Sequence, residues 1–225
     1  MNPHSPPALV YTLAFTSGFI IMSMELLGGP LLAPYFGGSV YVWGSIISVF
    51  MLALAAGYLV GGQLSIPSAS LRRFGLLFIV GAALLAPLPW INETVMAAIF
   101  DRVEDPRFGS LLACLSLFFL PTFVLGTLSP YAVRLLVENT ERSGAVAGRL
   151  YFVSTAGSAF GTLMTSFYFV LWFEMNTLFL LLAASLALAG SVAVVVAAVG
   201  RSTEGGAADD PNQAAKLTKL RESPS

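Results

Sequence analysis

The sequence predicts an all-α membrane protein, a bundle of six transmembrane helices with both termini in the cytoplasm. Of its 225 residues, 56% are hydrophobic and only 10% are charged, a balance that the surface of a soluble domain could not accommodate. Six apolar stretches are long enough to cross a hydrocarbon core, which takes about 20 helical residues. The positive charges gather in the segments that this arrangement places on one side of the membrane.

Helices are predicted because lipid cannot satisfy backbone polar groups, and the apolar runs are too continuous for alternating barrel strands. Pro30 and Pro34 should end the first span, and Pro121 and Pro130 should kink the fourth. The predicted domains are a short cytoplasmic leader (1–7), the membrane domain (8–199) and a disordered cytoplasmic tail (200–225). The predicted spans are 8–29, 40–64, 71–90, 109–137, 149–173 and 177–199.

The arginines and lysines set the expected orientation. With the N-terminus inside, only Arg102 and Arg107 face outward, in a segment (92–108) that is predicted to form an interfacial helix. The other nine basic residues face the cytoplasm: Arg72, Arg73, Arg134, Arg142, Arg149, Arg201, Lys216, Lys219 and Arg221. The leader has no Lys or Arg and no cleavage site, so the first helix is expected to be retained.

The composition excludes several classes of function. A net charge of −1 leaves no basic patch for nucleic acid. The single cysteine, Cys114, and the single histidine, His4, are too few for a metal site built on these residues or for an intrachain disulfide. No glycine-rich loop follows a strand, and no pair of carboxylates marks a catalytic centre. No cofactor and no catalytic residue is therefore expected in this chain.

Two of the spans share a pattern of small residues. Gly57 and Gly61 in the second span, and Gly157 and Gly161 in the fifth, are spaced at i and i+4 after an aromatic entry. Such glycines let helix backbones approach closely, so packing is the preferred interpretation. The alternative is that the spans form two related triplets, the 3+3 arrangement that builds each half of the large twelve-helix transporters.

Three sequence runs resemble a known family. They are MELLGGPLLAPYFGGSVYVWG at 24–44, PTFVLGTLSP at 121–130 and GRLYFVSTAGSAFG at 148–161. Together they resemble the membrane half of the bacterial fused transporter-like/spermidine synthase-like proteins, over nearly all of residues 12–188. The resemblance implies a bundle similar to half of an MFS-type transporter in a bacterial inner membrane. It also implies an S-adenosyl-binding, aminopropyltransferase-like domain after the membrane half, which this chain does not contain.

Two positions depart from the family pattern. Pro30 stands where members commonly carry Arg, and Ser154 stands where they tend to carry Asn. The soluble domain is the larger difference, because the 225 residues show no sign of it and any aminopropyltransferase-type activity would be expected to need a separate soluble domain. Such a partner would meet the predicted cytoplasmic face, where its S-adenosyl donor is found.

Glu25 is the acid that lies deepest in a predicted span. A carboxylate in lipid costs on the order of 2.5–3.5 kcal/mol, so it should face the bundle interior or a wet cavity. One interpretation is a site for a proton or for the ammonium group of a polyamine-like solute, and the other is a structural acid bonded to a neighbouring helix. Aromatic residues predicted to line the same cavity, or alternatively to form an interfacial belt, are Tyr35, Tyr41, Trp43 and Tyr151.

Arg134, Arg142 and Arg149 make a charged loop that would suit docking of a soluble partner. The predicted function is thus the membrane module of a spermidine synthase-like system, which moves or delivers a small cationic or amphipathic solute. The alternative is a non-transporting membrane anchor for a cytoplasmic aminopropyltransferase-like or methyltransferase-like partner. Six helices seldom enclose an alternating-access pathway, so a homodimer or another partner is expected if transport occurs.

Overall fold

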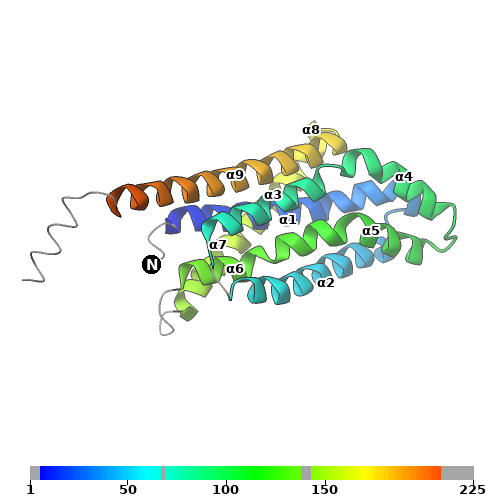
Figure 1. The fold of residues 1–225 in the computed structure, drawn as a ribbon. Coiled ribbons are helices and arrows are strands. Elements are labelled where there is room, and N and C mark those ends of the chain that lie inside the picture. The colour runs from blue at the N-terminus through cyan, green and yellow to red at the C-terminus, as the bar shows by residue number, and fades with distance from the viewer. Residues whose placement is uncertain (1–5, 67–68, 138–142, 209–225) are drawn as a thin grey trace, which may run out of the picture.

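The computed structural model describes residues 6–66, 69–137 and 143–208, and every regular element within them is a helix (Figure 1). Four helical segments are long and apolar enough to cross a membrane: Pro7–Phe36, Val40–Leu64, Pro106–Leu136 and Met175–Gly200. A bent pair, Leu71–Leu85 with Leu88–Phe100, makes a fifth if it counts as one span. These findings confirm an all-α membrane protein with four or five candidate spans.

The first helix is longer than the sequence predicts. Helix α1 (Pro7–Phe36) continues through Pro30 and Pro34, so the expectation that these prolines end it is wrong. Each proline removes one helical hydrogen bond, yet the residues around them are held by packing, with Leu32 fully buried. The helix ends where Gly37 takes a φ of 78°, a conformation that glycine adopts without strain.

The second and third spans differ in how well the sequence predicts them. Helix α2 (Val40–Leu64) coincides with its predicted span. The third predicted span is instead divided into α3 (Leu71–Leu85) and α4 (Leu88–Phe100), which meet at an angle of 51°. Pro87 and Pro89 explain the break, because neither can donate a backbone hydrogen bond. Helix α4 therefore contains part of the segment that was predicted to form a separate interfacial helix.

The second half of the chain also contains interruptions. Helix α5 (Pro106–Gly126) is separated from α6 (Leu128–Leu136) at Thr127, while Pro121 lies inside α5. Helix α7 (Ser143–Met164) continues through a π-helical turn, η2 (Thr165–Phe169), into the short α8 (Val170–Trp172). Helix α9 (Met175–Ala208) completes the bundle, and the remainder of the predicted tail lies outside the described residues.

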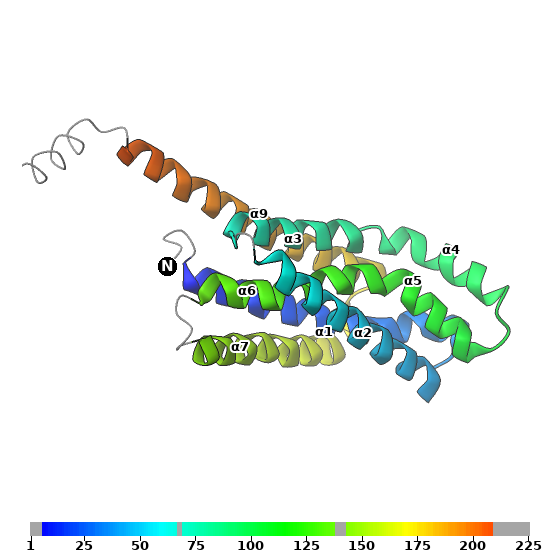
Figure 2. The ribbon, with the colours of Figure 1, turned by 60° about the horizontal axis from the view of Figure 1, so that its bottom comes forward.

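The helices associate most closely in three pairs, α1 with α7, α2 with α5, and α3 with α9. Figures 1 and 2 show α3 running beside α9 in both views. Glycines lie at all three interfaces. In the third pair, a Cβ added to Gly75 would stand 2.6 Å from the carbonyl oxygen of Gly190, and the reverse distance is also 2.6 Å. This close backbone approach requires glycine on both helices.

The other two pairs use glycines at equivalent positions. On α2, a Cβ at Gly57 would collide with the carbonyl oxygen of Phe123, and one at Gly61 with that of Thr127. On α7, Gly157 and Gly161 make the corresponding approaches to carbonyl oxygens of α1, those of Phe15 and Phe19.

These contacts relate the two halves of the chain by constant shifts in sequence. Adding 100 to the numbers of the α2 glycines, Gly57 and Gly61, gives the α7 glycines, Gly157 and Gly161. Adding 108 to Phe15 and Phe19, whose carbonyls are contacted on α1, gives Phe123 on α5 and Thr127. The same shifts relate two further close approaches, that of Gly126 to the backbone of Leu54 and that of Gly18 to the backbone of Ser154. The two pairs are therefore repeats of one packing arrangement, which relates α1 and α2 to α5–α6 and α7.

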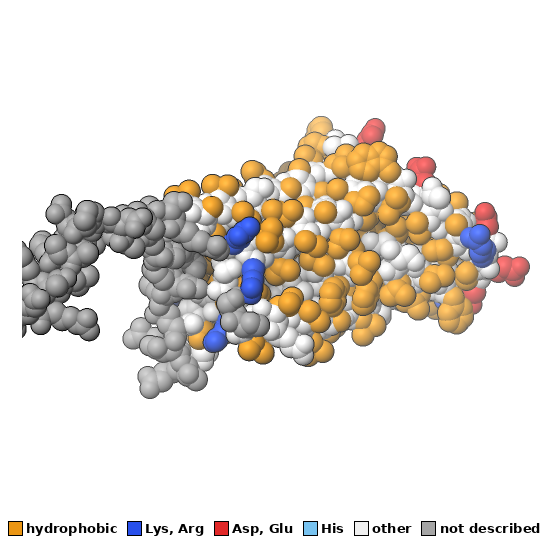
Figure 3. All heavy atoms as spheres, viewed as in Figure 1, with side chains coloured by type: hydrophobic (Ala, Val, Ile, Leu, Met, Phe, Trp, Pro, Cys, Tyr) orange, Lys and Arg blue, Asp and Glu red, His pale blue; other side chains and the backbone are white. Residues whose placement is uncertain are grey.

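On the face that Figure 3 shows, the charged side chains lie toward the two ends of the bundle, with a hydrophobic belt between them. The end at which α3 and α7 begin carries exposed Arg72, Arg73, Arg134 and Arg149. The opposite end is mainly acidic among the described residues, with Glu93, Asp101, Arg102, Glu104, Asp105, Arg107 and Glu174.

Candidate functional site

A central cleft of about 430 Å³ opens between five helices of the bundle. Its walls mix hydroxyl groups with apolar side chains, and they contain no Asp, Glu, Lys, Arg or His. The lining residues are Ser17, Gly18, Ile21, Met22, Leu54, Tyr58, Leu125, Ser129, Pro130, Tyr151, Ser154, Thr155 and Ser158.

The cleft lies between the two repeats. The constant shifts that relate the packing contacts also pair the lining residues with one another. The two residues of each pair line the same cavity from opposite repeats, so the cleft lies at the centre of the internal repeat. The pairs are Ser17 with Leu125, Ile21 with Ser129, Met22 with Pro130, Leu54 with Ser154, and Tyr58 with Ser158.

Seven of the lining residues carry hydroxyl groups, and most of these groups are available to a ligand. Ser17 donates a hydrogen bond to the carbonyl oxygen of Ala14, and Ser158 is within 3.2 Å of that of Gly18. The side-chain hydroxyls of the other five residues make no hydrogen bond within the described part of the chain: Tyr58, Ser129, Tyr151, Ser154 and Thr155. Polar groups in a membrane interior need a partner, so water or a bound solute must meet them.

Helix α7 supplies most of this polar wall. Tyr151, Ser154, Thr155 and Ser158 follow the i, i+3, i+4, i+7 spacing of one helix face. The glycines of α7 lie beside that face and hold the helix against α1. Sequence reasoning found the glycines and Tyr151 but missed the hydroxyl stripe, although its helical spacing was a readable signal.

Glu25 is not one of the lining residues, but it lies one helical turn beyond them on α1, toward the acidic end of the bundle. On α1 the cleft is lined by residues 17, 18, 21 and 22, and Glu25 continues this face one turn further, about 6 Å along the helix. Helical side chains lean toward the N-terminus of their helix, which directs Glu25 back toward the cleft. The residue is half-buried and makes no hydrogen bond or ion pair with any described residue.

Two residues of α5 lie on the helix face that contributes Leu125 to the cleft. Cys114 is buried there. Thr122 lies one turn before the cleft residue Leu125 on the same face of α5, and its buried hydroxyl has no hydrogen-bond partner within the described part of the chain. A further polar group without a partner thus lies on the face of α5 that leads to the cleft.

The remaining predicted aromatic residues lie near the acidic end of the bundle, outside the cleft. The ring of Tyr35 packs against Phe36 and Phe100. Tyr41 lies beneath the guanidinium group of Arg107, which is 4.5 Å from the centre of its ring. The ring of Trp43 covers Gly29 of α1. Of the predicted set, the structure brings only Tyr151 into the wall of the cleft.

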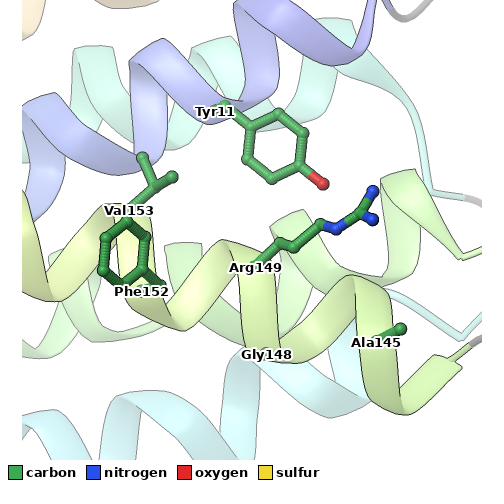
Figure 4. Close-up of a pocket in the computed structure, with 6 residues that line it drawn as sticks. All are labelled: Tyr11, Ala145, Gly148, Arg149, Phe152 and Val153. Atoms are coloured by element: carbon green, nitrogen blue, oxygen red, sulfur yellow. The ribbon is translucent and has the colours of Figure 1, made fainter.

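The predicted docking arginines lie at the arginine-rich end. Arg134 and Arg149 are exposed, whereas Arg142 lies outside the described residues. Arg149 borders a second, open groove of about 510 Å³ between α1 and α7. Figure 4 shows its guanidinium group and the Tyr11 hydroxyl extending in the same direction, beside an apolar wall formed by Phe152 and Val153.

Within the described residues, no group of three His, Cys, Asp or Glu side chains is placed to hold a metal ion. No protein-family model, curated protein or solved structure matches this chain. The central cleft, with Glu25 one helical turn beyond its lining residues, is therefore the candidate site on geometry alone.

Proposed function

We propose that this chain is the membrane module of a transporter-like system, which moves or delivers a small cationic or amphipathic solute. The observation that carries the proposal is the central cleft, where unpaired hydroxyls line a cavity between two repeats. The carboxylate of Glu25, also without a partner among the described residues, lies one helical turn beyond the lining residues of α1. Membrane proteins seldom place ionisable groups within their spans without a functional role. Transporters built from inverted repeats bind their substrates at the interface between the repeats.

The proposal includes six spans. The bent α3–α4 pair would be one, and the continuous helical run from Ser143 to Trp172 would be another. The hydropathy of α7 is lowered by its glycines and its cleft-facing hydroxyls, which would face protein and solute instead of lipid. The repeated packing of α1 with α7 and of α2 with α5 supports a 3+3 arrangement, similar to half of an MFS-type transporter.

The charge at the two ends supports the proposed orientation. The arginine-rich end would face the cytoplasm and the acidic end would face outward, as the positive-inside rule requires. In a bacterial inner membrane, Arg134 and Arg149 would then be accessible to a cytoplasmic, S-adenosyl-binding synthase-like partner. A second copy of the chain would complete a twelve-helix assembly around the open cleft.

A non-transporting membrane anchor is the second candidate. The four exposed arginines at one end favour it, because they form a positive surface on which an acidic soluble protein would dock. The anchor function gives no role to the unpaired hydroxyls of the cleft, so we place it second.

Calorimetry on the purified protein in lipid nanodiscs tests the proposal, with simple amines and spermidine as candidate solutes. Glu25→Gln keeps the size of the side chain and removes its charge, so binding of cationic solutes should weaken by about tenfold or more. Glu174→Gln, an exposed acid outside the cleft, is the matched control and should bind as the wild type does. If none of the solutes binds, the anchor function is favoured over solute handling.

A further inference from the structure

The charge content of the site limits the class of solute. The walls of the cleft contain no charged side chain, and Glu25 is the one acid that continues its lining face on α1. A solute with several ammonium groups would leave all but one of them unpaired in a medium of low dielectric constant, at high cost in free energy. A single positive charge matches the single carboxylate.

The dimensions of the site indicate an elongated solute. From Ser17 to Glu25 the lining face of α1 extends over eight residues, which corresponds to about 12 Å at 1.5 Å per residue. The carboxylate lies at one end of this length. The hydroxyl groups of α7 begin at Tyr151, toward the arginine-rich end, and extend to Ser158.

Apolar side chains border the path between the two ends. Ile21 and Met22 on α1, with Leu54 and Leu125 on the facing helices, line the cleft beside the hydroxyl groups. They provide a surface for a hydrocarbon chain. The site therefore offers a carboxylate, an apolar stretch and a group of hydrogen-bonding hydroxyls.

We propose that the cleft binds a slender amphipathic monocation with one ammonium group and one uncharged hydrogen-bonding end. The ammonium group pairs with Glu25, the chain lies against Met22 and Leu54, and the uncharged end bonds to hydroxyls that include those of Tyr58 and Ser154. This ligand class rests on the solute-handling function proposed above. It differs from the polyamine-like solute that was one interpretation of Glu25 in the sequence, because a polyamine carries charge along its whole length.

Three probes with the same eight-carbon chain test the ligand class: an amino alcohol, a diol and a diamine. Their binding to the protein in nanodiscs is measured by calorimetry, with binding to empty nanodiscs subtracted. The amino alcohol should bind most tightly. The diol lacks the ammonium group and the diamine places a second charge among neutral hydroxyls, so each should bind about tenfold more weakly or worse.

Variants at the two ends should act on different probes. Glu25→Gln should reduce the affinity for the amino alcohol to that of the diol and leave the diol unchanged. Tyr58→Phe or Ser154→Ala should weaken both probes, because both carry the hydroxyl end. Ser185→Ala on α9 is the matched control, since its hydroxyl bonds to its own helix at the carbonyl of Leu181.

Tighter binding of the diamine than of the amino alcohol would overturn the ligand class and leave the solute-handling function intact. Equal effects of Glu25→Gln on the diol and on the amino alcohol would overturn the assignment of the ammonium group to Glu25. If none of the three probes binds and no amine binds in the earlier experiment, both the ligand class and the proposed function fail.

Discussion

The two repeats of this chain keep the same packing contacts but present different side chains to the cleft. In both, a pair of glycines brings one helix against carbonyl oxygens of its neighbour, α2 against α5 and the following Thr127, and α7 against α1. On the cleft face, α2 contributes Leu54 and Tyr58, whereas the equivalent positions on α7 are Ser154 and Ser158. The packing glycines thus agree between the repeats, whereas these cleft-lining positions differ.

Sterics explain why the packing faces agree. A Cβ at any of these glycines would overlap a backbone atom of the neighbouring helix, and no rotation of a side chain could relieve that overlap. The cleft face has no such constraint, because an open cavity accepts side chains of many shapes. One repeat supplies two of the seven cleft hydroxyls, those of Ser17 and Tyr58, and the other repeat supplies the remaining five.

The largest expected effect concerns the orientation of the repeats. If the second triplet is inverted relative to the first, a cysteine at Ser143 should be shielded from an impermeant thiol reagent in intact cells. A cysteine at Glu104 should be labelled. The measurement uses a Cys114→Ala background, which removes the one native thiol. Labelling at Ser143 with protection at Glu104 would reverse the proposed orientation, and labelling at neither would refute exposure of the 101–105 turn.

The shared packing faces predict equal sensitivity in the two repeats. Gly57→Leu and Gly157→Leu should each lower the stability by about 1–3 kcal/mol or more, because the added side chain must displace backbone. Thermal melting in mild detergent measures this loss. Gly62→Leu is the matched control, since no atom lies within 4 Å of a Cβ at that glycine. If Gly157→Leu melts at the same temperature as the control, the two repeats do not depend equally on their packing glycines.

The divergent cleft faces predict a loss of binding without a loss of stability. Thr155→Val removes an unpaired hydroxyl at nearly constant volume, so the affinity for the amino alcohol should fall roughly three- to tenfold, as expected for a neutral hydrogen bond. Thr162→Val is the control on the same helix, because the Thr162 hydroxyl bonds to the carbonyl oxygen of Ser158. The hypothesis fails if the two variants bind alike.

The smallest effect is expected at the acidic end of the bundle, at a contact that the two repeats do not share. Arg107 lies over the ring of Tyr41, an exposed cation–π contact worth about 0.5–1 kcal/mol. Arg107→Gln should lower the melting temperature slightly. Arg102→Gln should lower it less, because the Arg102 side chain, in the turn after α4, bonds only to the nearby carbonyl of Ala98. A double-mutant cycle with Tyr41→Leu measures the coupling free energy between the two side chains, and a coupling of zero would show that their contact does not stabilise the protein.

The sequence was sufficient for the all-α membrane class and for the bounds of α2, because continuous apolar runs identify membrane helices directly. It failed where tertiary packing outweighs local signals, as at Pro30 and Pro34, which stay within α1. It also overestimated the apolar character of the fifth predicted span, since its hydroxyls and glycines reduce the mean hydropathy of α7 below that of the other long helices.

The candidate site was predictable only in part. Glu25 could be found from its charge within an apolar run, because such a residue is costly in lipid. The cleft itself joins residues from positions 17 to 158, and its existence depends on how the repeats pack. Single-residue reasoning selected Tyr35, Tyr41 and Trp43 as further members, although the structure places them outside the cleft walls.

Native mass spectrometry of the protein, released from nanodiscs after gentle purification, tests the central claim most directly. The account predicts that the wild type retains a bound small molecule that is not a phospholipid and carries a single positive charge. It predicts that the Tyr58→Phe/Ser154→Ala double variant, folded to the same melting temperature, loses that molecule. A wild type that carries only phospholipid, or a double variant that retains the same molecule to the same extent, would contradict the claim that the cleft handles a solute.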